Sequence, residues 1–468
     1  MLDEQHIAAT VTEDATLRDD EGRIRPDYVD RVIAAITAGD AAPLKTLVGD
    51  LHEADVGALI EALDHDLRPQ LIELMGSDFD FAALTEVDDT VREEILEELE
   101  PQTVADGVRE LDSDDAVYIL EDLPHAERQE ILEQLPPPER VALARILDYP
   151  EGAAGRRMQT DFIAVPPAWT VGRTIDYMRE TSDLPERFYA IHVIDPGRRL
   201  VGEVMLDRLL RTKRPVVISE IMEEEQRRVR ATDDVEEVAR LFERYNLIAV
   251  PVLDDADRLV GVITVDDVVD VIEEEAEEDL RALGGVRDEE LSDTVFTIAK
   301  SRFNWLVVNL ATAFLASSVL GLFEGQLQKM VALAVLAPIV ASQGGNAATQ
   351  TMTVAVRALA IRELSSMNAW RVILRELLVG LLNGLAFAVI TGAAAYAWFR
   401  MPDLGVVIGL AMICNLVAGA LGGILIPLVL QRFNADPAVS SGVFVTTVTD
   451  VVGFFSFLGI ATLWFGLA

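Results

Sequence analysis

Asp450 is a lone acid in the apolar stretch that ends this 468-residue chain, because Pro437–Ala468 contains no other charged residue. Counted as a helix from Val439, it lies roughly 16 Å along the axis, near the middle of a hydrocarbon core ~30 Å thick. A carboxylate at that depth costs at least ~2.5–3.5 kcal/mol, so we expect it to face protein or water rather than lipid. Three threonines among the four preceding residues add hydroxyls. The pattern predicts a cation site, with a protonated structural aspartate as the alternative.

A second polar segment, Gln343–Gln350, interrupts another apolar stretch and contains Gly344, Gly345 and Asn346. Pro338 precedes it and removes one backbone donor from a helix. We therefore expect this span to be broken, with freed carbonyls and the Asn346 side chain offering oxygen dipoles to a cation. The alternative is that the glycines only let helices pack closely.

Carboxylate, amide and carbonyl oxygens are ligands for hard cations, and Mg2+ usually keeps several of its waters. One acid per chain with small neighbours therefore predicts a wide site for a hydrated divalent cation, with Mn2+ and Co2+ as alternatives to Mg2+. The single cysteine, Cys414, excludes a cysteine-based metal cluster and an intrachain disulfide. No nucleophile–base pair stands out from the acidic background, so the sequence does not predict an enzyme.

Five apolar stretches could position these groups, and each exceeds the ~20 residues that a membrane-spanning helix needs. They are Phe303–Phe323, Met330–Val356, Leu377–Phe399, Leu404–Leu430 and Pro437–Ala468. Most basic residues of this half precede the first stretch or lie between the second and third: Lys300, Arg302, Arg357, Arg362, Arg371 and Arg375. The positive-inside rule then places the N-terminus in the cytosol and, after five spans, the C-terminus outside the cell membrane.

The first 300 residues are strongly acidic. Residues 301–468 hold six of the 79 acids and eight of the 39 bases, so residues 1–300 hold 73 acids and 31 bases, a formal charge of −42. Such a field repels nucleic acid and anionic headgroups and attracts cations. We expect divalent cations and no nucleic acid as partners, with a merely solvated surface in a salty cytosol as the alternative. Met1–Asp30 has no apolar core and does not read as a signal peptide.

Short helices are predicted for residues 1–150. Segments rich in leucine and acids recur at Ile95–Leu99, Ile119–Leu123 and Ile131–Leu135, and a proline follows each within two residues. Proline ends a helix because it lacks the backbone donor. The repeat predicts an all-α superhelical domain.

An internal repeat follows in residues 151–272. Val193–Ile194–Asp195 returns 59 residues later as Val252–Leu253–Asp254, and a Leu-Val-Gly triplet follows each copy five residues after its aspartate. Each unit predicts a strand, a polar turn, a second strand and a helix. The repeat resembles a tandem pair of CBS domains, a regulatory α/β module. In that family a Thr and an Asp after the second strand hold a nucleotide, which here implies Thr264 and Asp267 and makes ATP a candidate ligand.

Val265–Arg281 predicts a helix that carries nine acids on its way into the apolar half. Like charges three and four residues apart repel and oppose helix formation. At 4 Å each unscreened pair costs ~1 kcal/mol in water and ~4 kcal/mol at an effective dielectric constant of 20. Bound divalent cations would reverse that repulsion, and a solvated charged linker is the alternative.

The order of these parts resembles the MgtE family of magnesium transporters over essentially the whole chain. The most specific motifs are Gly344–Gly345–Asn346, Arg357–Ala358–Leu359–Ala360, Asp436–Pro437–Ala438 and Thr449–Asp450–Val451. The resemblance implies a multidomain homodimer for magnesium homeostasis, embedded in membrane lipid with its pore on the twofold axis. Its parts would be a helical domain (1–150), a CBS pair (151–272), an acidic connecting or plug helix (265–300) and a five-span pore domain (301–468).

The resemblance also implies roles for individual residues. Asp450 takes the role of the pore aspartate that binds hydrated Mg2+, and Asn346 that of a pore-lining neighbour. The implied Mg2+-sensing acids are Asp267, Asp270, Glu275, Glu278 and Asp279 on the plug helix, Asp234 and Glu236 in the second CBS unit, and Asp114 in the helical domain. Asn246 stands where the family has a further acid, so we do not expect that cytosolic site to be complete.

Together these features favour a Mg2+ importer that cytosolic Mg2+ closes by bridging the acidic faces. A cation-coupled carrier, in which Asp450 titrates, is one rival interpretation. A non-transporting sensor is the other, although no output domain is recognisable.

Overall fold

The computed structural model describes residues 17–19, 22–121, 123–181, 184–185, 187–224, 227–286, 295–360, 362–364, 368–433 and 437–467. The chain divides into two compact units, Met1–Glu275 and Ala276–Ala468, and each is described by itself. Asp436, part of one family motif, lies outside the described residues.

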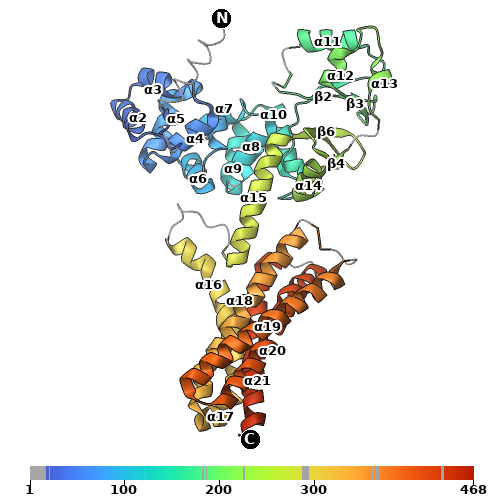
Figure 1. Ribbon diagram of the computed structural model, residues 1–468. Coiled ribbons are helices and arrows are strands. Elements are labelled where there is room, and N and C mark those ends of the chain that lie inside the picture. The colour runs from blue at the N-terminus through green and yellow to red at the C-terminus, as the bar shows by residue number, and fades with distance from the viewer. Residues whose placement is uncertain are drawn as a thin grey trace, which may run out of the picture. The chain divides into compact units, whose positions relative to one another are not determined.

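Short helices fill the first part of the N-terminal unit (Figure 1). They are α2 Pro26–Ala38, α3 Ala41–Val48, α4 Glu53–Glu61, α5 Arg68–Met75, α6 Asp89–Glu98, α7 Pro101–Val108, α8 Ser113–Glu121, α9 His125–Gln134 and α10 Pro137–Leu147. Prolines mark several of these boundaries. Pro101 and Pro137 occupy the first turn of the next helix, where the missing N–H would have no partner in any case. The predicted helical domain is confirmed.

Two small sheets follow, and each has three strands in sequence order. The first contains β1 Ala164–Val165, β2 Ala190–Ile194 and β3 Leu200–Met205, and the second contains β4 Val229–Arg230, β5 Ala249–Leu253 and β6 Leu259–Thr264. In both sheets the last two strands are antiparallel, and the register shifts after equivalent residues, Val193 and Val252. The shared irregularity confirms the internal repeat. Helices α11 Val171–Glu180, α12 Leu206–Arg211, α13 Ile218–Ile221 and α14 Val235–Tyr245 complete the two units.

The second sheet shares one hydrophobic core with the helical domain, whereas the first sheet has a core of its own. Val250 and Ile263 of the second sheet belong to the same buried cluster as Leu120 of α8. Val268 and Val271, from the first turns of α15 (Val265–Gly284), belong to it as well. The acidic helix is therefore anchored to the helical domain by apolar contacts.

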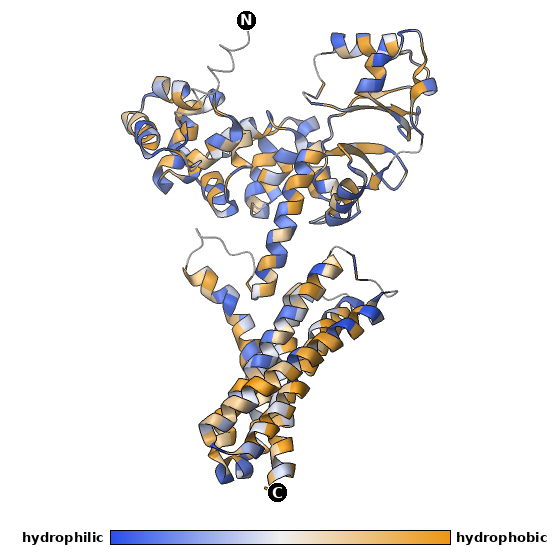
Figure 2. Ribbon diagram, in the orientation of Figure 1, coloured by the Kyte–Doolittle hydropathy of each residue, from blue (hydrophilic) through white to orange (hydrophobic). Residues whose placement is uncertain are grey.

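The described part of the C-terminal unit contains five helices long and apolar enough to cross a membrane. They are α16 Val295–Gly321, α18 Val331–Ala360, α19 Ala369–Phe399, α20 Pro402–Arg432 and α21 Pro437–Phe465, with the short α17 Glu324–Lys329 after the first. Figure 2 shows them as mostly hydrophobic. Within this unit α20 packs against α18, α19 and α21.

The expectation of a broken second span is wrong. Helix α18 runs without interruption from Val331 to Ala360 with Pro338 inside it. Its glycines serve close packing, since a Cβ on Gly344 would lie 2.1 Å from Nδ2 of Asn415 on α20. The helix survives because Pro338 removes only one donor, and because neighbouring helices fill the space beside the glycines.

The shared core yields a first prediction. Val268→Ala removes two buried methyl groups from α15 and should lower the free energy of local opening of residues 265–275 by about 2 kcal/mol. Hydrogen exchange of these amides in the full-length protein measures that opening. Val269→Ala is the matched control, because Val269 is 54% exposed and Val268 1%. Equal effects of the two substitutions would contradict the anchoring role.

Candidate functional site

The two residues assigned to the pore lie on adjacent helices of the C-terminal unit. Asn346 lies on α18 and Asp450 on α21, and these helices pack against each other. Gly345 faces Thr449, since a Cβ on the glycine would lie 3.9 Å from the threonine Oγ1. The neighbours of this pair, Asn346 and Asp450, therefore lie at the same level of the two helices. Asn346 is exposed on a single chain and Asp450 is partly exposed.

The hydroxyls near Asp450 donate to their own helix. Thr449 Oγ1 donates to the Thr446 carbonyl at 2.9 Å, and Thr447 Oγ1 donates to the Val443 carbonyl at 2.6 Å. No hydrogen bond or ion pair to the Asp450 carboxylate occurs within the described part of the chain. The carboxylate is thus available to a ligand, and the hydroxyl oxygens can still accept hydrogen bonds from waters on that ligand.

Asn415 is a structural residue that the sequence analysis missed. It is fully buried in α20, where its Nδ2 donates to the Val340 carbonyl of α18 at 2.7 Å. A Cβ on Gly344 or Gly453 would lie 2.1 or 2.7 Å from the same nitrogen. Asn415 therefore sets the spacing of α18, α20 and α21 next to the pore residues. An amide inside an uncharged span was the available signal.

A second candidate site is a cavity of about 120 Å3 in the N-terminal unit, which we call the acidic pocket. Six carboxylates and one guanidinium line it, together with three other side chains: Glu86, Asp114, Asp115, Asp267, Asp270, Glu274 and Arg157, with Thr85, Tyr118 and Val271. Among the described residues no three acids or histidines converge closely enough to hold a metal directly. The cavity has room for several waters, so it suits a cation that keeps part of its hydration shell.

Asp114 and Asp267 form the centre of the acidic pocket. Asp114 is 5% exposed, and neither of its carboxylate oxygens has a hydrogen-bond partner in the described part of the chain. Burial, followed by the charge of Asp267, raises the pKa of Asp114 well above its usual value. Asp267 accepts a 2.7 Å hydrogen bond from Thr264 Oγ1, yet burial still raises its pKa to about 6. A buried carboxylate that has no donor among the described residues, next to a second, partly buried carboxylate, needs either a shared proton or a cation.

The other acids of the pocket show the same tendency. Burial, with the charge of Asp267 as the next cause, raises the pKa of Asp115 to about 7. Burial also raises the pKa of Glu86, Asp270 and Glu274, and Arg157 opposes this at Asp270 and Glu274. The sequence pointed to Asp114, Asp267 and Asp270 but missed the other lining residues. The Asp114–Asp115 pair was the only local signal for them.

The remaining predicted sensor acids do not line this pocket. Asp234 caps α14 by accepting a 2.9 Å hydrogen bond from the Glu236 backbone, and the Glu236 side chain pairs with Arg240. Asn246 ends the same helix with a left-handed φ of 50°, which explains why an amide is accepted there. Glu275, Glu278 and Asp279 lie further along α15. Their sensing roles stay predictions.

The nucleotide prediction is split between two places. Thr264 lines a cleft between the two sheets that includes His192 and Asp161, whereas Asp267 lines the acidic pocket. His192 was also missed; it is 3% exposed, its Nδ1 has no hydrogen-bond partner among the described residues and lies 4.0 Å from Oε2 of Glu203, and burial lowers its pKa to about 4. Nucleotide binding stays a prediction.

The far end of α15 contacts the helices that carry the pore residues. Within the C-terminal unit, Ala282 packs in one buried cluster with Ala348, Met352 and Val356 of α18 and Val445 of α21. The helix ends there, because Gly285 takes a φ of 71° and a Cβ on it would lie 2.0 Å from Trp305. Residues of α15 thus belong to buried clusters of both units, Val268 and Val271 in one and Ala282 in the other.

Comparisons with known proteins agree with this division. Family models described as "Divalent cation transporter", "MgtE intracellular N domain" and "CBS domain" match residues 337–460, 51–152 and 218–274. The magnesium transporter MgtE of Thermus thermophilus is 32% identical over 450 residues, which cover 92% of this chain and 96% of that protein. Its counterpart in Bacillus subtilis is 26% identical over 433 residues, with the same two coverages.

A solved structure is also similar. It is the cytosolic domain of the Mg2+ channel MgtE in complex with ATP, 29% identical, covering 52% of this chain and 99% of that one with a TM-score of 0.48. The matches place an intracellular domain before the candidate spans. With its helical domain, two CBS sheets and five apolar helices, the chain belongs to the MgtE family of magnesium transporters, which transport Mg2+ across a membrane and are not enzymes.

Proposed function

We propose that the chain is a Mg2+ channel that admits Mg2+ to the cytosol past Asp450 and Asn346, and that Mg2+ in the acidic pocket closes it. The observation that supports the closing step most strongly is the Asp114–Asp267 pair, in which Asp114 is buried without a hydrogen-bond donor among the described residues and faces a second carboxylate. One of them lies on α15, the helix whose other end packs against α18 and α21.

The pore part of the proposal follows from the cost of polar groups in a membrane. Asn346 is exposed on a single chain and Asp450 is partly exposed, although both lie on candidate spans. Polar groups at membrane depth face protein or water rather than lipid. A second copy of the chain would supply the opposite wall, so we propose a homodimer with a wet path between the two copies. The C-terminus would then lie outside.

The closing step follows from the charge of the acidic pocket. Without a cation, repulsion among the six carboxylates favours separation of α15 from the helical domain. Bound Mg2+ turns the net interaction from repulsion into attraction and holds α15 against the helical domain. A ligand shifts such an equilibrium only through its different affinities for the two states, and ~5.5 kcal/mol moves a population from 1:99 to 99:1. Several weak sites, including the acids further along α15, could supply this together.

We also propose adenine nucleotide as a ligand of the cleft between the two sheets. Thr264 lines that cleft, and the relative crystallised with ATP has the same domain type. Asp267 would take part only indirectly, through the hydrogen bond that it accepts from Thr264.

Transport itself is tested at Asp450. Asp450→Ala should lower Mg2+ uptake into proteoliposomes at least about tenfold. The substitution removes a charged ligand, and a loss of ~1.4 kcal/mol already corresponds to a factor of ten. Asp403→Asn is the control, since Asp403 is the acid in the first turn of α20. Competition with Mn2+ and Co2+ tests selectivity. Uptake that depends on a proton or Na+ gradient would favour the carrier instead.

The sensor is tested by charge removal in the acidic pocket. Asp114→Asn together with Asp267→Asn should raise the Mg2+ concentration that half-closes the channel by about tenfold or more, because both central ligands are lost. Glu273→Gln with Glu277→Gln removes two charges from α15 outside the pocket and should change the midpoint little. Unchanged closure in the first variant would refute the sensor role of these two acids. Neutralising Asp270, Glu275, Glu278 and Asp279 together tests the remaining acids of α15 in the same assay.

Protons should compete with Mg2+ in this pocket. The pKa values of Asp267 and Asp115 are raised to about 6 and about 7, so these groups hold protons that Mg2+ must displace as the pH falls. The Mg2+ midpoint for protection of α15 should therefore decrease as the pH rises from 5.5 to 7.5. Without Mg2+ the sign is opposite: both folded pKa values exceed the unfolded values near 3.9, so stability falls as the pH rises through about 4 to 7. Asp115→Asn should flatten both trends, and a midpoint independent of pH in the wild type would contradict them.

A further inference from the structure

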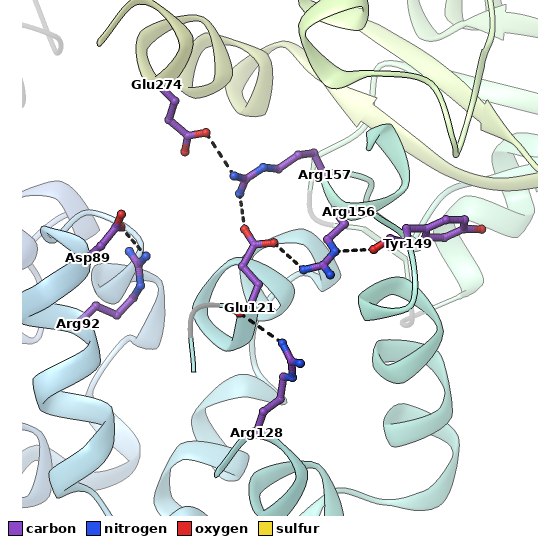
Figure 3. A network of polar contacts seen from close by, with 8 residues as sticks. All are labelled: Asp89, Arg92, Glu121, Arg128, Tyr149, Arg156, Arg157 and Glu274. Carbon is purple, nitrogen blue, oxygen red and sulfur yellow. Dashed lines mark hydrogen bonds and ion pairs between the residues drawn. The ribbon is translucent and has the colours of Figure 1, made fainter. Parts of the chain in front are cut away.

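Arg157 is the basic side chain among the residues that line the acidic pocket. One of its terminal nitrogens lies 3.2 Å from Oε2 of Glu274 on α15, and the other lies 3.3 Å from Oε1 of Glu121 on α8 (Figure 3). A guanidinium is planar and always charged, so it can bridge two carboxylates at once. Arg157 thus joins α15 to the helical domain through its own charge.

The surroundings of Arg157 fix its position. Its guanidinium carbon lies 4.7 Å from the centre of the Tyr118 ring, and the Arg92 guanidinium lies 4.4 Å from the same ring centre. Glu121 also accepts a 3.0 Å hydrogen bond from Arg156, which is itself held by the carbonyl of Tyr149 at 2.8 Å. Figure 3 shows Glu121 in contact with both Arg156 and Arg157, and the Arg157 side chain extending to Glu274 of α15.

Helix α15 contacts the helical domain through acids at two positions along one of its faces. Asp267, Asp270 and Glu274 are spaced at i, i+3 and i+7, so they lie on one face of the helix. Asp267 faces Asp114, and Glu274 contacts Arg157, about 10 Å further along the axis. The Mg2+-dependent contact would lie at the first position and the arginine contact at the second.

We propose that Arg157 is a permanent cation of the acidic pocket, which offsets part of the carboxylate repulsion when Mg2+ is absent, so that the Glu274 contact is kept while the Asp114–Asp267 position opens. The proposal rests on the proposed sensing role of the pocket and adds its Mg2+-free state. A single guanidinium against six carboxylates leaves a formal charge of −5 if all are ionised, so the pocket still attracts Mg2+. Arg157 would keep the acids close enough together for Mg2+ to bridge them.

The test is hydrogen exchange of residues 265–275 in the full-length protein, in EDTA and at saturating Mg2+. In EDTA, Arg157→Gln should speed exchange of these amides about tenfold, because the variant loses two charge-assisted contacts. At saturating Mg2+ the variant should regain nearly the wild-type protection, since Mg2+ still bridges the Asp114–Asp267 position. Arg157→Lys keeps the charge but cannot contact two carboxylates with a planar guanidinium, so its exchange rate should lie between those of the wild type and Arg157→Gln. Arg109→Gln removes an equivalent charge that pairs with Glu139 outside the pocket and should match the wild type.

Two results would overturn the proposal. One is wild-type exchange of Arg157→Gln in EDTA. The other is a loss of protection that persists at saturating Mg2+ and extends over α8, which would make Arg157 a general structural residue. Failure of the sensing proposal is a separate observation, because the wild-type amides of residues 265–275 would then exchange at the same rate with and without Mg2+. In that case the EDTA comparison alone still decides the role of Arg157.

Discussion

One constraint shapes the N-terminal unit. The apolar contacts that stabilise its hydrophobic core also bring several like-charged carboxylates together. Val268 and Val271 of α15 are buried in the core shared by the helical domain and the second sheet. Asp267, Asp270 and Glu274 follow the same turns of the helix and enter the acidic pocket with them. The apolar contacts cannot form without bringing the acids together. Protons, Arg157 or bound cations must therefore offset the repulsion.

In the C-terminal unit, close helix packing likewise brings polar side chains together. Glycines and the buried Asn415 let α18, α20 and α21 approach closely. That close approach brings Asn346 and Asp450 to one level, while the threonine hydroxyls are used within their own helix. A carboxylate without a protein partner at membrane depth has its lowest cost beside water or a hydrated cation.

Helix α15, which is continuous from Val265 to Gly284, contributes residues to the cores of both units. Its first turns are anchored by the shared core, and Ala282 near its end packs against α18 and α21. In the proposed gating, a state with α15 docked and a state with it released would differ by the ligands of the acidic pocket, as a two-state element requires.

The sequence by itself determined the five apolar helices, the repeated strand pairs, the acidic helix and the midspan position of Asp450. These features depend on hydrophobic length, period and short motifs, all of which are local. Tertiary structure alone decided that α18 is continuous despite Pro338, because neighbouring helices fill the space beside its glycines. It also decided that Glu86, Asp115, Arg157 and Glu274 share one pocket, and that Asp234 and Glu236 serve α14 instead. Residues so far apart in the chain meet only through the packing of the shared core, which no local pattern encodes.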